Sequence, residues 1–187
     1  MILDIVKYGD PVLRQKGRPV AQITDELRSL AADMIETMHE ANGVGLAAQQ
    51  VGVPIQFTVL EVSDSDDRPS TMSVDGKPAI LADWMPLVIM NPVLELSRDK
   101  ETGSEGCLSF PEITADIERS ISVKAKGLLI DGRQIEFEAT GLLARALQHE
   151  ADHLNGILFI DRMNSATKTA IKSKLKRLQR ETVAMGR

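Results

Sequence analysis

Two histidines four residues apart, with a glutamate between them, form the part of the sequence best suited to chemistry. They lie in His149-Glu150-Ala151-Asp152-His153, a His-Glu-x-x-His pattern. On an α-helix, positions i and i+4 lie on one face, so His149 and His153 can bind the same metal ion. The carboxylate of Glu150 can then exchange protons with a water on that metal. The alternative is a surface helix with two unrelated histidines, which the fixed spacing of three residue types disfavours.

A third ligand has to come from elsewhere in the chain, because a catalytic metal usually takes three protein ligands and one water. A histidine three residues after Gly156 would indicate one class of metalloprotease, but Phe159 stands there. His39 is far upstream, and Glu181 lies in a basic segment near the end of the chain. Cys107 is the better candidate, since a thiolate is a strong ligand for zinc or ferrous iron. Otherwise this lone cysteine would be a small buried hydrophobe.

Length and composition predict one soluble domain, since 43% of the 187 residues are hydrophobic and 26% are charged. A net charge of −5 argues against a general nucleic-acid binder, so we expect no stable DNA binding. A single cysteine excludes an internal disulfide. The first residues lack the pattern of a signal peptide, and no apolar run approaches membrane-spanning length. These features predict a cytoplasmic protein without membrane contact.

Hydrophobic spacing predicts three helices. The first spans residues 25–41, with Thr24 as its N-cap and Asn42-Gly43 at its end. The second carries the His-Glu-x-x-His pattern and has Thr140 as its cap. The third covers residues 165–187, with Ser165 as its N-cap. Its narrow apolar stripe consists of Ile171, Leu175 and Leu178.

Strands are predicted by composition at 55–62, 87–90 and 93–96, and as a hairpin of 117–130 and 134–139. Three other stretches are expected to be an extended segment with a turn at Gly9-Asp10-Pro11 (1–23), an exposed loop (63–78) and a strand or core segment (157–160). This order of elements predicts an α+β fold. We expect a single catalytic domain over residues 1–187, with antiparallel or mixed sheets around the central motif-bearing helix and a C-terminal helix.

Positive charge is concentrated at the end of the chain. Residues 165–187 hold seven Lys or Arg and one Glu, whereas the rest of the chain holds 15 basic and 26 acidic residues. A basic helix on an acidic body can be a docking surface for an acidic partner such as RNA. The alternative is an ordinary solvated helix face.

Three blocks of the sequence, taken in order, resemble the motifs of the peptide deformylase family. Residues 43–50, Gly-Val-Gly-Leu-Ala-Ala-Gln-Gln, resemble its first motif, Gly-x-Gly-x-Ala-Ala-x-Gln. Residues 105–109, Glu-Gly-Cys-Leu-Ser, match its second motif, and residues 148–153 match its third, Gln-His-Glu-x-Asp-His. The opening at 10–14 is also similar, so the resemblance covers roughly residues 1–164.

The resemblance implies a metal-dependent hydrolase that removes the N-formyl group from the initiator methionine of nascent proteins and releases formate. By the family's motifs, Cys107, His149 and His153 would bind the metal. In the family this metal is Fe2+, with Zn2+, Ni2+ or Co2+ as substitutes. A metal-bound hydroxide would attack the formyl carbonyl, with Glu150 as the general acid/base.

The resemblance also implies how N-formyl-methionyl peptides are held. Gln50 and the backbone N–H of Leu108 would stabilise the developing oxyanion, and backbone at Val44, Gly45 and Gly106 would pair with the peptide. The pocket for the methionine side chain is expected to be lined by Leu142, Arg145 and Ala146, with the aliphatic stem of Arg145 in its wall.

Three further expectations concern Thr114, Arg119 and the basic helix at 165–187. Thr114 stands where the family often has a substrate-contacting arginine, so that role is not carried over to this chain. Arg119 is expected to pair with Glu105. Because family members act on nascent chains, the basic helix at 165–187 is a candidate contact with the ribosome.

The sequence is also compatible with two other functions. A His-Glu-x-x-His metallopeptidase would use Glu181 as its third ligand. A non-catalytic metal-binding protein would hold the metal without turnover, and the basic tail would be its working part.

Overall fold

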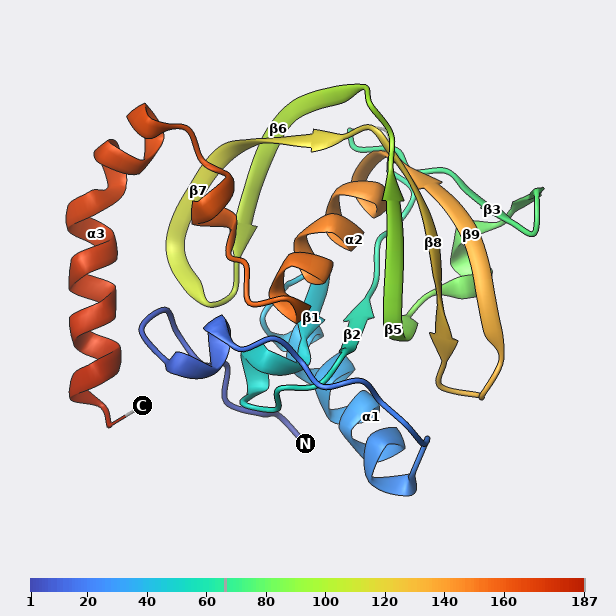
Figure 1. Cartoon of the computed structure of the whole chain (residues 1–187), viewed down its shortest axis with the longest axis horizontal. Helices are drawn as coiled ribbons and strands as arrows, with labels where there is room; N and C mark the ends of the chain where they lie inside the picture. Colours follow the sequence, from blue (N-terminus) through green and yellow to red (C-terminus); the bar gives the residue numbers. More distant parts are fainter. Residues whose placement is uncertain (66, 187) are drawn as a thin grey trace.

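Helix α2 (Gly141–Leu154) runs through the centre of the molecule, with strands wrapped around it and two further helices outside (Figure 1). The computed structural model describes residues 1–65 and 67–186. Almost every side chain of α2 is buried, including His149, Glu150 and His153. A helix buried on all sides belongs to the core, and here that core position fixes the motif-bearing side chains.

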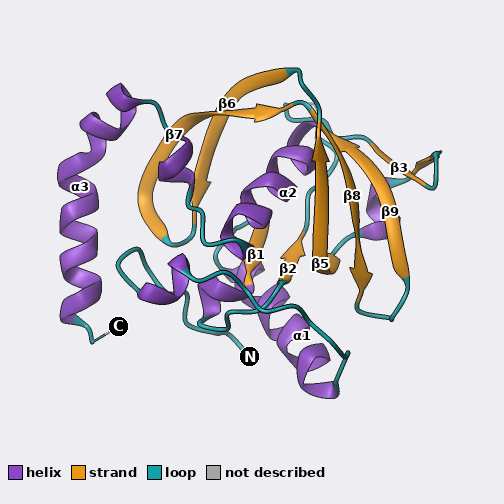
Figure 2. Cartoon of the chain, in the orientation of Figure 1, coloured by secondary structure: helices purple, strands orange, loops and turns teal. Residues whose placement is uncertain are grey.

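Two antiparallel sheets surround α2 (Figure 2). The larger sheet has seven strands in the order β1-β2-β5-β8-β9-β3-β4, and the smaller one consists of β6 and β7. The strands of the larger sheet are β1 (Gly45–Ala47), β2 (Phe57–Leu60), β3 (Met72–Val74), β4 (Lys77–Ala79), β5 (Leu87–Leu96), β8 (Ser122–Leu129) and β9 (Gln134–Thr140). Those of the smaller sheet are β6 (Lys100–Cys107) and β7 (Phe110–Ser120).

The outer helices pack through narrow apolar faces. α1 (Asp25–Glu40) buries Met34 and Met38 in a cluster that also contains Phe57 of β2. α3 (Ser165–Ala184) stands at the edge of the molecule and packs through Ile171, Leu175 and Leu178 against the side of β7. No helix within the described residues is long and apolar enough to cross a membrane.

The α+β fold and its central helix are as predicted. The first helix begins after Thr24, whose side chain accepts a hydrogen bond from Leu27 N. The hairpin predicted at 117–130 and 134–139 is present as β8 and β9, but residues 117–120 belong to β7. The apolar stripe of α3 is confirmed, although its N-cap is Asn164 rather than Ser165. Asn164 Oδ1 accepts a hydrogen bond from Thr167 N at 2.8 Å, so the side chain of Asn164 caps the helix.

The exposed loop predicted at 63–78 is only partly a loop. Residues 72–74 form β3, which pairs with β9, and β4 closes the hairpin. Met72 is buried in the core under α2 and Val74 packs against the same cluster, but two apolar residues are too short a periodic signal to be recognised in a polar stretch.

Two other segments differ from the prediction, and a third agrees with it. The strands expected at 87–90 and 93–96 form one strand, β5, with a register irregularity between Met90 and Val93. The turn at Gly9-Asp10-Pro11 leads into a 3₁₀ helix, Pro11–Arg14, capped by Asp10. Residues 157–160 form a core segment, one of the two forms predicted: Leu158, Phe159 and Ile160 are buried, and a further 3₁₀ helix spans Phe159–Arg162.

Candidate active site

Three side chains from two distant segments converge at the C-terminal half of α2. Cys107 ends β6, and His149 and His153 lie one turn apart on α2. Their ligand atoms all lie within 4.8 Å of one another, and Cys107 Sγ is 3.3 Å from His153 Nε2. In a tetrahedral site with metal–sulfur and metal–nitrogen bonds of about 2.3 and 2.0 Å, sulfur and nitrogen are roughly 3.5 Å apart. The spacing therefore fits a divalent cation.

The second nitrogen of His149 supports the same interpretation. His149 Nδ1 is 2.8 Å from Glu105 Oε1, which leaves Nε2 for the site. Metal-binding histidines usually donate their other ring N–H to a carboxylate in this way. Burial would lower the pKa of His149, but hydrogen bonds with Cys107 and Glu105 outweigh it and raise the pKa to about 10, so a metal has to displace a proton from this ring to bind Nε2. Burial lowers the pKa of His153 well below its usual value, so that ring is neutral and able to bind a metal.

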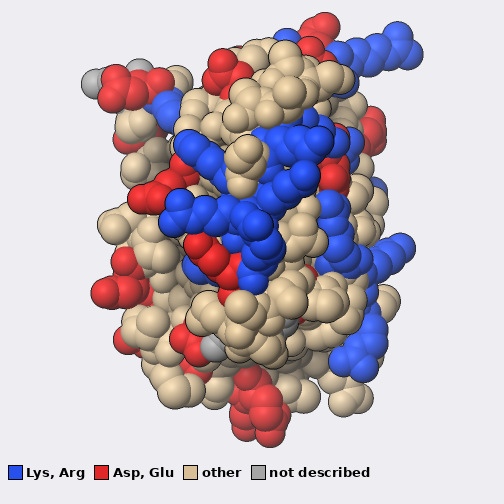
Figure 3. Space-filling model, turned by 90° about the vertical axis from the view of Figure 1, so that its left-hand side faces the viewer, with Lys and Arg blue, Asp and Glu red and all other residues tan. Residues whose placement is uncertain are grey.

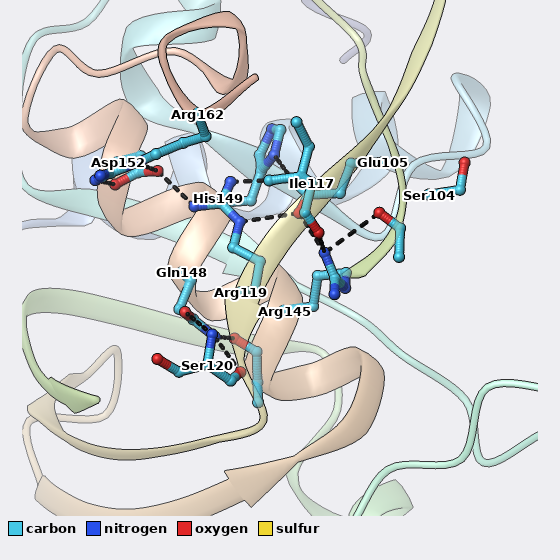
Figure 4. A network of polar contacts seen from close by, with 12 residues as sticks. Ser104, Glu105, Ile117, Arg119, Ser120, Arg145, Gln148, His149, Asp152 and Arg162 are labelled. Atoms are coloured by element: carbon cyan, nitrogen blue, oxygen red, sulfur yellow. Dashed lines mark hydrogen bonds and ion pairs between the residues drawn. The ribbon is translucent and has the colours of Figure 1, made fainter. Parts of the chain in front are cut away.

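Behind His149, a buried chain of ion pairs connects the strands to α2 (Figure 4). Arg119 donates to Glu105 Oε2 at 2.9 Å and to Asp152 Oδ2 at 2.6 Å, which confirms the expected pairing of Arg119 with Glu105. At the far end, Arg162, which is exposed, donates to both carboxylate oxygens of Asp152. Burial would raise the pKa of Glu105, but hydrogen bonds from His149 and Arg119 hold it well below its usual value.

Glu150 lies on the same helix, beside the first histidine, and only 4% of its surface is exposed. A Cβ atom at Gly45 would lie 2.5 Å from Glu150 Oε1, so only glycine leaves room for this carboxyl group. Glu150 Oε2 is buried and has no hydrogen-bond partner among the described residues. Burial raises the pKa of Glu150 to about 7, which suits a group that accepts and returns a proton near neutrality.

The amide of Gln50 faces the cysteine. Its Nε2 is 3.7 Å from Cys107 Sγ and donates to Ser109 Oγ at 3.2 Å, while its Oε1 accepts from Ala47 N at 2.9 Å. This last bond fixes which end of the amide points to the site. Leu108, which follows the cysteine, has its backbone oxygen held by Lys7 Nζ at 3.0 Å.

A cavity of about 470 Å³ opens onto these groups. All six residues expected to contact the peptide line it, together with Gln50, Cys107, Leu108, His149 and Glu150. Those six are Val44, Gly45, Gly106, Leu142, Arg145 and Ala146. The head of Arg145 binds Glu105 Oε2 at 2.8 Å and Ile117 O at 2.8 Å, so its stem remains for the cavity wall.

The alternative ligands lie elsewhere. Glu181 pairs with Arg177 at 3.0 Å on the exposed face of α3. His39 pairs with Glu61. Neither belongs to the Cys107 cluster, which is the one group of this kind found among the described residues.

Sequence reasoning missed two cavity-lining cations. Lys7 comes from the N-terminal segment, and Arg68 comes from the segment between β2 and β3. No motif marks either residue, because their places depend on how these segments dock rather than on local pattern. It also missed the link from Arg119 through Asp152 to Arg162 for the same reason.

A buried helix with a His-Glu-x-x-His pattern, completed by a cysteine at the end of a cavity, has the architecture of a metallohydrolase. Comparison with known proteins then gives the family. The polypeptide deformylase family matches residues 2–169. A peptide deformylase of Methylacidiphilum infernorum (isolate V4) is 47% identical over 180 residues, which are 96% of this chain and 94% of that protein.

Solved structures agree with this match. The peptide deformylase from Thermus thermophilus aligns with a TM-score of 0.81 at 35% identity, over 97% of this chain and 99% of that one. The peptide deformylase from Ehrlichia chaffeensis aligns with a TM-score of 0.82 at 32% identity, over 98% and 99%. The chain belongs to the peptide deformylase family, whose members are hydrolases.

Proposed function

We propose that this chain hydrolyses the formyl group from N-formyl-methionyl peptides and releases formate. The observation that carries the proposal is the convergence of Cys107, His149 and His153 beside a cavity of about 470 Å³ that Cys107, His149 and Glu150 line. Membership of the deformylase family supports the same reaction.

Cys107, His149 and His153 would hold the cofactor, and one thiolate with two imidazoles suits Fe2+, or Zn2+, Ni2+ and Co2+ as substitutes. A cation bound there supplies a Lewis acid that polarises the formyl carbonyl and makes a water more acidic. Ferrous iron and a thiolate are both sensitive to air, so activity should be measured without oxygen.

Glu150 moves the protons in this proposal. Its carboxylate takes a proton from the attacking water and later gives it to the amine that leaves with the peptide, so the carboxyl is unchanged after one turnover. The burial of Glu150 and its pKa of about 7 support both roles.

Gln50 and Leu108 would stabilise the charge that develops on the carbonyl oxygen. Gln50 Nε2 is already aimed at the cysteine, and its position is fixed by the bond from Ala47 N. A preorganised donor of this kind is worth about 3 kcal/mol in the transition state. The backbone N–H of Leu108 would be the second donor.

The peptide would lie between two strand edges. β1 is the last strand of the larger sheet, and β6 pairs only with β7 within the described chain, so each has an unpaired edge at the cavity. Strand addition at such edges binds backbone without regard to sequence, which suits an enzyme acting on many proteins. Leu142 and Ala146 would then receive the methionine side chain.

The basic helix α3 is our candidate contact with the ribosome. Figure 3 shows Lys and Arg side chains gathered on this side of the molecule. The exposed cations on α3 are Lys168, Lys172, Lys174, Lys176, Arg177 and Arg180. Reversing Lys172 and Lys176 to Glu should reduce co-sedimentation with ribosomes while leaving the buried stripe intact, and unchanged co-sedimentation would remove this idea.

The reaction is tested by formate release from formyl-Met-Ala-Ser under anaerobic conditions with iron-loaded protein. We expect catalytic release of formate and no cleavage of the Met-Ala bond. Cleavage of that bond would favour the metallopeptidase alternative, and a loaded protein that releases nothing would favour the non-catalytic one.

A further inference from the structure

Arg68 places a positive charge in the wall of the peptide cavity, from a segment outside all three motifs. Its Nη2 donates a hydrogen bond of 3.2 Å to the backbone oxygen of Ser104 on β6. A guanidinium carries five N–H donors, so others remain for a ligand. The adjacent carboxylate, Glu105, is already engaged by Arg119, Arg145 and His149.

Two contacts fix the segment of Arg68 to the N-terminal end of α2. Leu143 N donates to Ser70 Oγ at 3.0 Å. The backbone oxygen of Pro69 lies so close to Gly141 that a Cβ there would be 1.8 Å from it. The helix that carries the histidine pair therefore also sets the position of Arg68, two residues before Ser70.

The direction of β6 shows which part of a substrate reaches this point. The strand runs from Ser104 through Gly106 to Cys107, and an extended peptide on its free edge advances by the same distance of about 3.3 Å per residue. A formyl group at Cys107 therefore places the first peptide residue beside Gly106 and the third beside Ser104. Side chains one and three of an extended peptide lie on the same face. The third side chain thus points to the α2 side of the cavity, where Arg68 lies.

We propose that Arg68 binds a carboxylate on the third residue of the formylated peptide and makes the enzyme prefer Asp or Glu at that position. The inference rests on the proposed deformylase function. A planar guanidinium pairs with a carboxylate through two parallel hydrogen bonds, which lysine cannot reproduce. Because Arg68 lies far from the formyl group in this register, it should act on binding of substrate and transition state alike.

The test compares kcat/KM for formate release from formyl-Met-Ala-X-Ser, with Asp, Asn or Lys at X. We expect the Asp peptide to exceed the Lys peptide by about three- to tenfold at low salt, a difference that added salt reduces. Arg68→Ala should bring this ratio to about one by raising KM for the Asp peptide, and Arg68→Glu should reverse it. The control is Arg98→Ala, which removes an exposed arginine just before β6 and should keep the original ratio.

The possible results distinguish the role of Arg68 from the deformylase function. If the protein releases formate equally from all three peptides, or if Arg68→Ala keeps the original ratio, the role of Arg68 is overturned and the deformylase function stands. If no peptide yields formate, both are overturned.

Discussion

His149 Nδ1 and Glu105 Oε1 lie 2.8 Å apart, and this contact joins the helix with the histidine pair to the strand that ends in Cys107. Glu105 also receives Arg119 and Arg145, so one buried carboxylate orients His149 and holds β6 against α2. The orientation of His149 therefore depends on a carboxylate that is itself held by two buried arginines.

The first prediction concerns this carboxylate. Glu105→Gln should weaken metal affinity by about 10- to 100-fold, because the amide no longer fixes His149 through a charged acceptor. It should also lower the free energy of unfolding by about 3–5 kcal/mol, because Arg119 and Arg145 lose a buried counter-charge. Competition with a chelator and urea unfolding measure the two effects. Glu101→Gln, at an exposed site on the same strand, is the control, and equal affinities in both variants would contradict the account.

The second prediction separates metal binding from proton transfer. Glu150→Gln should lower kcat by at least about 100-fold, because the amide cannot accept the proton that the carboxylate takes, while the metal content stays close to one per chain. Formate release and metal analysis on the same sample check both parts. Substantial turnover in this variant would show that another group acts as the base.

The third prediction uses the contact between β1 and α2. Gly45→Ala places a Cβ 2.5 Å from Glu150 Oε1 and should displace the carboxyl group, so formate release should fall sharply although the fold is retained. Gly52→Ala is the matched control. Gly52 has φ +82° and nothing within 4 Å of an added Cβ, so its replacement should cost about 1–2 kcal/mol of stability and leave kcat unchanged. Full activity in Gly45→Ala would contradict the packing described for Glu150.

The fourth prediction concerns stability in acid. Burial would raise the pKa of Asp161, but hydrogen bonds from Arg14 and Leu158 N lower it below its usual value. A carboxylate with a depressed folded pKa contributes stability above its unfolded pKa of about 3.9 and loses it as the pH falls through the folded pKa. Asp161→Asn should therefore lower the free energy of unfolding by up to about 1 kcal/mol at pH 7, since the Arg14–Asp161 pair is partly exposed. It should have no effect at a pH where the carboxyl group of Asp161 is protonated in both the folded and the unfolded state. Urea unfolding from pH 7 to pH 2 measures the difference, and a constant difference would refute the assignment.

Much of the candidate site can be predicted from local patterns in the sequence. The helical spacing of His149 and His153 and the motif around Cys107 are readable because each depends on neighbours within a few residues. Local patterns do not predict that Cys107 meets His149 and His153, since this depends on how β6 pairs with β7 and packs against α2. The same reason explains why the ion pair between Arg162 and Asp152 could not be predicted.

The segment at 63–78 shows most clearly what local sequence patterns do not predict. Its composition is that of a loop, yet Met72 enters the core and Ser70 caps the amide of Leu143. Single contacts of this kind leave no periodicity in the sequence, although they place Arg68 at the peptide cavity.

The central claim is that one sulfur and two imidazole nitrogens bind a single cation. X-ray absorption spectroscopy on anaerobically purified protein tests it directly. We expect one metal per chain with one sulfur neighbour at about 2.3 Å and nitrogen or oxygen neighbours near 2.0–2.1 Å, and loss of the sulfur neighbour in Cys107→Ser. A spectrum without sulfur, or one that Cys107→Ser leaves unchanged while Glu181→Ala removes the metal, would contradict the account.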